Sequence, residues 1–509
     1  MKLSDLVRSV DHTLLSGTED REITGLCRDN RKASPGDLFI CTKGARFDTH
    51  DPAVVRGLFE KGITSFVAEQ PLDVPEADVL IVPDTRKAGA LIYSAWYGHP
   101  ENEMTMIGIT GSKGKTTTAH MIRKLLEASG QTVGLIGTNG AEYPGCVEEL
   151  ANTTPDYDEL EYHLRAMADR KVRYCVLEVS SQAVLMERVD HIDFKVAVWL
   201  NLQEGDHIGP NEHESFRNYM ECKARLLSQA TKRLVNTDDP YSYKTIDLAK
   251  RAAVKRQVSG GFETFGTFGH ETYTASDIRP YYDETEKRPG VLFHMKGICV
   301  DDDILVGFPG EWHVYNAMAA VAVARSFGVP KEIFTKALFN VPIRGREELV
   351  YRGDFTVCVD FAHNGASAMA HLKGVHEYRP KRVICVFGAD GNRSKGRRYG
   401  MGEAAGRYAD LAIITSGHNR FETFEAILED TLVGINRAEH PNYIAIKDRE
   451  EAIRYAIDHA EPGDFITILG LGHEHWQEEN GIKRVYNDGD FVRSVLMEKG
   501  LLQRGNDHE

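Results

Sequence analysis

A glycine-rich loop between a strand pattern and a helix pattern is the feature that most constrains this chain. The apolar run Met106–Ile109 predicts a buried strand, and an apolar face that includes Ile122 and Leu126 predicts a helix ending near Gly130. Glycines in the loop let backbone N–H groups close on a phosphate, and the helix N-terminus adds positive potential. We therefore expect a nucleoside triphosphate to bind through the loop residues Gly111, Ser112, Lys113, Gly114, Lys115, Thr116 and Thr117.

Two side chains of this loop have defined expected roles. Lys115 would reach the terminal phosphates, and Thr116 would offer its hydroxyl to Mg²⁺. The strict phosphate-loop pattern has a glycine where Ile109 stands, so the motif departs at one position. The alternative is a surface turn rich in glycine and lysine, which the flanking strand and helix patterns disfavour.

The composition limits the kinds of partner. The chain has 509 residues, which is too long for one core, so roughly three domains are expected. Its formal net charge of −15 argues against nucleic-acid binding, which needs a basic face. No apolar run approaches the ~20 residues of a membrane span, and charged residues interrupt the stretch Met1–Leu15, so neither membrane insertion nor a signal peptide is expected. The eight cysteines form no CxxC pair, which favours a reducing compartment. We expect a cytoplasmic monomer.

Alternating strand and helix patterns predict an α/β protein with three domains. Residues 1–98 hold short strand patterns at 36–42, 64–68 and 78–82 without a nucleotide motif, and residues 99–342 contain the phosphate loop. Residues 343–509 alternate apolar runs with helix patterns, which is typical of a doubly wound parallel sheet. Within the central domain, alternating aromatic and threonine segments between 255 and 306 predict β-hairpins.

Three residues of the central domain stand out for their chemistry. Glu178 lies near the carboxyl end of a strand pattern, where a carboxylate can face Mg²⁺; the alternative is an edge-strand glutamate. His207 follows the next strand pattern and, taken alone, is more typical of a loop histidine. Lys223 falls on the apolar stripe of a helix pattern. A buried ammonium there must be paired, neutral or chemically modified, unless its head escapes to solvent.

Polar clusters follow four strand patterns of the last domain, at residues 360–363, 388–395, 416–420 and 470–474. Because the carboxyl ends of parallel strands meet at one edge of a sheet, we expect these clusters to line one crevice. The run His473-Glu474-His475 lacks the spacing of a zinc-binding helix, so no metal is expected there.

These stretches together resemble the Mur ligase family, and the resemblance runs nearly end to end. The matching stretches are Asp29-Asn-Arg31, Gly111–Thr116, Asn152–Pro155, Glu178–Ser181, Asp206-His207, Lys223, Gly345-Arg346, Asp360–His363 and Gly470–Glu474. Each is weak alone, whereas their order and spacing are specific. The resemblance implies an N-terminal domain that binds a UDP-linked substrate, a central P-loop ATPase domain, and a C-terminal Rossmann-like domain that binds ATP and the added amino acid.

The resemblance also implies a role for each matching residue. The catalytic set would be Lys115, Lys223, Glu178 and His207. Two Mg²⁺ ions would be held by Thr116, Glu178, His207 and Lys223, the last as a carbamate formed with CO₂. Further ATP contacts would come from Asn316, Arg346, Asp360 and His363. The UDP-substrate would contact Asp29, Asn30, Arg31, Asn152, Thr153, Thr154, Ser180, Ser181 and Arg188. The added amino acid would contact Arg393, His418, Asn419, Arg420, Gly470 and Glu474.

The implied reaction adds a diamino acid to the D-glutamate carboxylate of UDP-MurNAc-L-Ala-D-Glu in peptidoglycan precursor synthesis, through an acyl phosphate made with ATP. Diaminopimelate enzymes of the family carry Asp-Asn-Pro-Arg, where this chain reads Gly417-His-Asn-Arg420. The stretch 206–213 is similar to that of lysine-adding enzymes. L-lysine is therefore slightly favoured over meso-diaminopimelate. Two alternatives stay open: an amide ligase for another acceptor or amino acid, and a nucleotide-binding pseudoligase.

Overall fold

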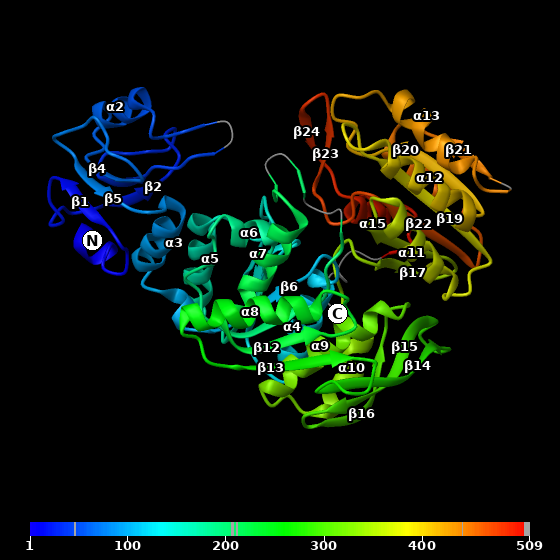
Figure 1. Ribbon diagram of the computed structural model, residues 1–509. Coiled ribbons are helices and arrows are strands. Elements are labelled where there is room, and N and C mark those ends of the chain that lie inside the picture. The colour runs from blue at the N-terminus through cyan, green and yellow to red at the C-terminus, as the bar shows by residue number, and fades with distance from the viewer. Residues whose placement is uncertain (45–46, 205–207, 210–211, 440, 503–509) are drawn as a thin grey trace. The chain divides into compact units, whose positions relative to one another are not determined.

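The computed structural model describes residues 1–44, 47–204, 208–209, 212–439 and 441–502 (Figure 1). The chain forms two compact units. The first contains residues 1–276, 294–302 and 315–337, and the second contains residues 277–293, 303–314 and the chain from 338 onward. The predicted domain boundaries near residues 98 and 342 stay predictions.

The first part of the first unit is a small sheet with the strand order β1-β5-β4-β3-β2. Three of its strands lie where the sequence predicts them, namely β3 (Asp37–Ile40), β4 (Ser65–Ala68) and β5 (Asp78–Ile81). Helices α2 (Pro52–Glu60) and α3 (Thr85–Trp96) follow aspartates whose side chains accept backbone N–H groups of the first turn. The other elements are α1 (Leu3–Leu6), β1 (Thr13–Ser16) and β2 (Gly25–Cys27).

The phosphate loop leaves the middle of a second sheet. Strand β6 (Thr105–Thr110) pairs in parallel with β10 (Tyr174–Glu178) on one side and β11 (Phe194–Trp199) on the other. Helix α4 (Lys115–Ala128) follows the loop, so the predicted strand–loop–helix is confirmed. The strand order across this part is β13-β12-β11-β6-β10-β7-β8-β9.

The remaining elements of this region are η1 (Pro100–Asn102), β7 (Val133–Gly137), β8 (Gly140–Tyr143), β9 (Cys146–Glu148), α5 (Tyr157–Asp169), α6 (Ser181–Leu185), α7 (Phe216–Ser228), β12 (Ala230–Asn236), α8 (Ser242–Arg256) and β13 (Gly261–Gly266). Strands β14 (Tyr273–Asp283), β15 (Arg288–Gly297) and β16 (Val300–Val306) are neighbours in sheet order, as hairpins in this part require. The prediction is wrong for β13, which pairs in parallel with both β12 and β14 and so forms no hairpin with them. They precede α9 (Trp312–Ser326), η2 (Lys331–Ile333) and α10 (Phe334–Phe339). Among the residues that the structure describes, no helix combines the length and apolar character needed to cross a membrane.

The second unit is built on a sheet with the order β17-β18-β22-β19-β20-β21, parallel except for the edge strand β17. The four predicted strands are confirmed as β18 (Thr356–Asp360), β19 (Arg382–Ala389), β20 (Leu411–Ser416) and β22 (Asp464–Leu469). The other elements are β17 (Glu348–Arg352), α11 (Gly365–His376), α12 (Lys395–Tyr408), α13 (Phe424–Ile435), β21 (Tyr443–Ala445), α14 (Arg449–Asp458), the hairpin β23 (Trp476–Glu479) and β24 (Ile482–Val485), and α15 (Asp488–Glu498).

A fully buried ion pair stabilises the carboxyl edge of this sheet. Arg449 and Asp488 have no exposed side-chain surface and share two hydrogen bonds of 2.7 Å. The same guanidinium donates to the carbonyl oxygens of Ser416 and Leu469, at the ends of β20 and β22. The Asp488 carboxylate raises the pKa of Arg449 against the opposing effect of burial. This pair therefore helps to hold two of the four polar clusters in place.

Replacing Asp488 by alanine is expected to lower the free energy of unfolding of the second unit by about 3–5 kcal/mol, because it leaves a buried guanidinium without its counter-ion. Urea unfolding monitored by circular dichroism measures this loss. Asp490→Ala is the matched control: Asp490 lies on the same helical turn, is 57% exposed and pairs with Arg344, so about 0–1 kcal/mol is expected. Equal losses in both variants would show that the buried Arg449–Asp488 pair stabilises the second unit no more than an exposed pair does.

Candidate active site

The phosphate loop and the start of α4 are held by contacts with Asn201 and Asn316 from other segments. Gly114 has φ +84°, and a Cβ there would lie 2.5 Å from Asn316 Oδ1, so glycine is required. The backbone N–H groups of Ser112 and Lys113 donate to the carbonyl and side-chain oxygens of Asn201, at 3.0 and 2.9 Å. Asn316 Oδ1 also accepts a hydrogen bond from Thr118 on α4, at 3.2 Å. Asn316, which the sequence assigns to the ATP site, therefore does lie beside the loop.

Two lysines converge on one carbonyl of the loop. The ammonium groups of Lys115 and Lys223 each donate to the Gly111 carbonyl oxygen at 2.9 Å. Lys223 is 2% exposed, and its Nζ lies 5.0 Å from the ring centre of Tyr219. The predicted burial of Lys223 on the apolar face of α7 is therefore confirmed, and its head does not reach solvent. Two cations at one acceptor repel each other, and this repulsion favours an anionic ligand or a change of charge at this point.

Glu178 is a buried carboxylate at the end of β10, with no exposed surface. It accepts hydrogen bonds from Thr116 Oγ1 at 3.0 Å and from the backbone N–H and hydroxyl of Thr138, both at 3.1 Å. A Cβ at Gly137 would lie 2.2 Å from Glu178 Oε1, so glycine makes room for the carboxylate. Carboxylate and hydroxyl oxygens are the donors that Mg²⁺ prefers, so Glu178 and Thr116 fit the ion that the sequence predicts. Of the two remaining predicted ligands, Lys223 lies beside the loop at Gly111, and His207 lies outside the described residues.

Several residues assigned to the UDP-substrate form a network around Glu178. Thr154 Oγ1 donates to the Glu178 carbonyl oxygen at 2.8 Å and accepts the Ser180 N–H at 3.0 Å. Arg188 donates to the Thr154 carbonyl oxygen at 2.7 Å and forms an ion pair with Asp156. The Thr153 hydroxyl lies 3.2 Å from that of Thr138, Ser181 is buried at the start of α6, and Asn152 lies in the exposed loop before them.

The N-terminal motif lies after β2 in the small sheet, as Asp29, Asn30 and Arg31. Arg31 pairs with Asp29 at 2.7 Å and is 83% exposed. The neighbouring Arg28 donates to Asp156 at 2.6 Å, the carboxylate that also receives Arg188. Asp156 thus connects the N-terminal motif to the network around Thr154. The sequence analysis missed Asp156, because an aspartate before a helix is most often only a cap.

In the second unit, the polar clusters after β18 and β22 meet. Asp360 accepts the backbone N–H groups of Glu347 and Ala362, both at 2.8 Å, and its carbonyl oxygen accepts the Gly470 N–H. The Arg346 guanidinium lies 4.7 Å from the ring centre of Phe361, which also contacts His363 and His473. Burial, and then the positive charge of Arg346, lowers the pKa of His473 to about 3, so this ring stays neutral. These contacts bring Arg346, Asp360 and His363 together, as predicted for the nucleotide side.

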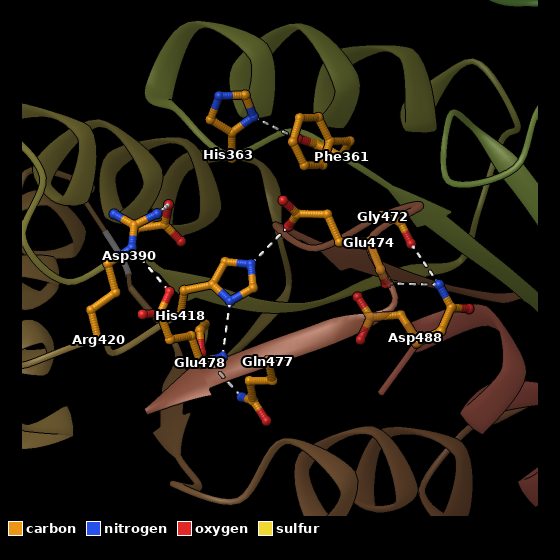
Figure 2. A network of polar contacts seen from close by, with 12 residues as sticks. Phe361, His363, Asp390, His418, Arg420, Gly472, Glu474, Gln477, Glu478 and Asp488 are labelled. Atoms are coloured by element: carbon orange, nitrogen blue, oxygen red, sulfur yellow. Dashed lines mark hydrogen bonds and ion pairs between the residues drawn. The ribbon is translucent and has the colours of Figure 1, made fainter. Parts of the chain in front are cut away.

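His418 and Glu474 form the centre of the second polar network (Figure 2). The Glu478 N–H donates to His418 Nδ1 at 3.1 Å, so Nε2 carries the ring proton and donates to Glu474 at 2.8 Å. The imidazole is therefore neutral with one tautomer selected. The ring of Trp476 lies 4.3 Å from that of His418. Because His418 follows β20 and Glu474 follows β22, the predicted meeting of these clusters is confirmed.

Arg420 lies at the edge of the same network (Figure 2). Its guanidinium donates to the Gly391 carbonyl oxygen at 3.0 Å and lies 3.6 Å from Asp390 and 3.8 Å from Glu478. Its φ is +52°, a conformation that costs free energy in a residue other than glycine. Asn419 is buried nearby, and Arg393 lies in the exposed loop before α12.

A cavity of about 590 Å³ adjoins this network, lined by residues from the cluster after β20 and from the hairpin β23–β24, including Ser416, Gly417, Asn419, Gln477 and Glu478. The sequence analysis missed Trp476, Gln477 and Glu478. The hairpin is short and polar, so it carries little strand signal of its own.

Comparison with known proteins agrees with this geometry. The sequence matches the "Mur ligase middle domain" over residues 109–324 and the "Mur ligase, glutamate ligase domain" over residues 345–472. It is 35% identical to the UDP-N-acetylmuramoyl-L-alanyl-D-glutamate--2,6-diaminopimelate ligase of Caldanaerobacter subterraneus subsp. tengcongensis, over 98% of this chain and 99% of the relative. This chain belongs to the Mur ligase family.

Further relatives cover the same length. The ligase of the same name from Geobacillus thermodenitrificans is also 35% identical, over 98% of this chain and 100% of its own. A solved structure of a diaminopimelate ligase of this name superposes with a TM-score of 0.69 at 25% identity, covering 98% and 99% of the two chains. As a Mur ligase, the chain is an ATP-dependent amide ligase of the ADP-forming kind. The three-domain Mur ligase architecture expected from the sequence is confirmed. The roles of individual Mur ligase residues stay predictions.

Proposed function

We propose that this Mur ligase joins 2,6-diaminopimelate to the D-glutamate carboxylate of UDP-N-acetylmuramoyl-L-alanyl-D-glutamate, in the cytoplasmic synthesis of peptidoglycan precursors. The observation that carries the proposal is that relatives 32–35% identical over nearly the whole chain have this activity in their names. The slight preference for L-lysine drawn from the sequence is not confirmed. L-lysine is kept as the second candidate because the family's Asp-Asn-Pro-Arg motif is altered here to Gly417-His-Asn-Arg420.

The proposed chemistry is activation of a carboxylate. The substrate carboxylate takes the γ-phosphate of ATP, ADP leaves, and the amine of the amino acid then displaces phosphate to form the amide. Lys115 would neutralise the negative charge that gathers on the phosphates during transfer. Mg²⁺ bound to Glu178 and Thr116 would supply further charge neutralisation. The network from Thr154 to Arg188 would hold the UDP-substrate so that its carboxylate faces the phosphate loop.

Lys223 is proposed to act as a carbamate. Its ammonium group would lose one proton, and the resulting neutral amine would add CO₂ and release a second proton, so that a buried cation becomes a buried anion. Support comes from its 2% exposure and from the Gly111 carbonyl that it shares with Lys115. The exchange of sign would convert repulsion between two ammonium groups into attraction, and it would add a carboxylate oxygen that suits Mg²⁺.

The proposed amino-acid site combines an arginine with carboxylates. Diaminopimelate differs from lysine in carrying a second carboxylate, and Arg420 is the cation beside the His418–Glu474 pair that could recognise it. The Glu474 carboxylate would accept hydrogen bonds from an ammonium group of the substrate. The neutral His418 fixes the orientation of Glu474 through the hydrogen bond from Nε2.

Arg420→Ala is expected to raise the KM for diaminopimelate by about 10–100-fold, the effect of losing one charged hydrogen-bonding partner, and to leave the KM for the UDP-substrate unchanged. Steady-state kinetics with each substrate varied in turn provide the measurement. Arg437→Ala is the matched control, since Arg437 is half exposed and contacts Glu403 and the Tyr399 ring, away from the His418–Glu474 network. Equal increases in both KM values would show that Arg420 does not face the amino acid.

Phosphate release from ATP and Mg²⁺ tests the proposed function, with UDP-MurNAc-L-Ala-D-Glu and diaminopimelate supplied together and each omitted in turn. Release that requires both substrates, together with the mass of the amide product, is the expected result. Release with the amino acid but with a different acceptor would identify another amide ligase. ATP binding without release under any condition would identify a pseudoligase.

A further inference from the structure

Three buried side chains that can bind metal ions meet outside the phosphate-loop site. Glu101 lies in η1, Glu161 lies on α5, and His191 lies in the loop before β11. One nitrogen or oxygen atom from each lies within 4.8 Å of those of the other two. The three side chains are 6%, 0% and 2% exposed, respectively. They come from segments far apart in sequence, so the cluster is a product of the fold.

Each of these side chains has one buried atom that lacks a hydrogen-bond partner. Glu101 Oε1 accepts from Ser94 Oγ at 2.8 Å, and Glu161 Oε1 lies 2.6 Å from His191 Nε2. By contrast, Oε2 of Glu101, Oε2 of Glu161 and Nδ1 of His191 have no partner among the described residues. Buried polar atoms are almost always paired, so the two unpartnered carboxylate oxygens in one cluster point to a missing cation. The ring nitrogen of His191 that faces Glu161 is Nε2.

The charges in the cluster favour a cation. Two buried carboxylates, those of Glu101 and Glu161, lie in one cluster and repel each other. His99 also faces the cluster: its Nδ1 lies 3.6 Å from Glu101 Oε1, and its side chain is half exposed. The nearby cations Lys87, Arg225 and Arg256 are paired with Asp190. A divalent ion with a neutral imidazole would balance both carboxylates.

We propose that Glu101, Glu161 and His191 bind a divalent transition-metal ion of the Zn²⁺ or Mn²⁺ type. One imidazole nitrogen with two carboxylate oxygens is a donor set suited to these ions, whereas Mg²⁺ and Ca²⁺ prefer oxygen donors alone. The ion would tie together η1, α5 and the loop before β11. In that loop His191 lies three residues after Arg188, whose guanidinium donates to the Thr154 carbonyl oxygen. The metal would therefore stiffen the segment that carries a predicted UDP-substrate contact.

A second group with metal-binding donors, Cys146, Glu148 and His163, is less suited to hold an ion. Glu148 is exposed, and His163 Nδ1 already lies 3.1 Å from the Tyr143 hydroxyl. His163 of this second group provides a control variant for the metal-binding experiment, because it lies on α5 only two positions from Glu161 and is equally buried.

The test uses the full chain without an affinity tag, stripped with EDTA and then titrated with ZnCl₂ in the absence of ATP. Bound zinc per chain is measured by mass spectrometry after gel filtration, and the unfolding midpoint is measured with and without zinc. We expect one tightly bound Zn²⁺ per chain and a higher midpoint in its presence. Glu161→Gln and His191→Gln should each weaken zinc binding by more than about tenfold and abolish the increase in midpoint.

Two controls locate the ion. His163→Gln and Glu178→Gln should both keep the tightly bound zinc, since they alter the second group and the phosphate-loop carboxylate. The far-ultraviolet circular dichroism of every variant, compared with that of the unaltered chain, shows that it is folded. Absence of tight zinc binding in the unaltered chain would overturn the proposal. Loss of zinc in His163→Gln with retention in a folded His191→Gln would also overturn it.

Discussion

Replacing Lys223 by alanine should lower the turnover number by about a thousandfold or more, while the KM for ATP changes little. The physical reason is that Lys223 lies against the phosphate loop, and its carbamate would stabilise charge that develops only during phosphate transfer. Phosphate release under saturating substrates measures this effect. Normal turnover in Lys223→Ala would contradict the carbamate assignment.

Two further measurements separate a carbamate from a lysine that is simply buried. In CO₂-free buffer the unaltered enzyme should lose activity, and added bicarbonate should restore part of it. Lys223→Arg should stay inactive, because a guanidinium keeps the positive charge and does not form the carbamate. Arg217→Ala is the control: Arg217 lies on α7 like Lys223, but its side chain is 79% exposed and pairs with Glu221 four residues later, so about normal turnover is expected. Recovery of activity by Lys223→Arg would show that only a positive charge is needed.

Glu178→Gln should lower kcat by about 100–1,000-fold and raise the Mg²⁺ concentration needed for half-maximal rate by about tenfold or more. The amide keeps the size of the side chain and an oxygen that can accept the Thr138 N–H, so the fold should be retained. It lacks the negative charge that the ion requires. The measurement is the rate of phosphate release as a function of Mg²⁺ concentration.

Glu127→Gln is the matched control for Glu178→Gln. Glu127 lies on α4, the helix that begins at the phosphate loop, but is 39% exposed and pairs with Arg123 four residues earlier. No change in magnesium dependence is expected there. If both variants showed the same Mg²⁺ dependence as the unaltered enzyme, Glu178 would not be a magnesium ligand.

Local patterns were sufficient to predict the parts of the site that depend on one segment. The strand–loop–helix around Gly114 was predictable because apolar residues are spaced differently along a buried strand and along an amphipathic helix. The burial of Lys223 followed from its place on the apolar stripe of α7. The convergence of the clusters at residues 360, 418 and 470 followed from the parallel order of the strands that precede them.

Contacts between distant segments were not predictable in this way. The hydrogen bond between the Glu478 N–H and His418 joins residues 60 positions apart, and the polar hairpin that makes it has no apolar period. The same is true of Asp156, which receives Arg28 from the N-terminal sheet. The cluster of Glu101, Glu161 and His191 shows no motif spacing at all, because it depends on how three segments pack. His207 falls outside the described residues, so its predicted role stays a prediction.

The measurement that tests the central claim most directly is a competition between meso-diaminopimelate and L-lysine at equal concentrations. The enzyme is supplied with ATP, Mg²⁺ and UDP-MurNAc-L-Ala-D-Glu, and the products are separated by mass. We predict that the diaminopimelate adduct dominates, and that Arg420→Ala reduces this preference. Exclusive formation of the lysine adduct would contradict the proposed substrate and would assign the altered Gly417–Arg420 motif to lysine selection. Formation of neither adduct would contradict the proposed ligase activity itself.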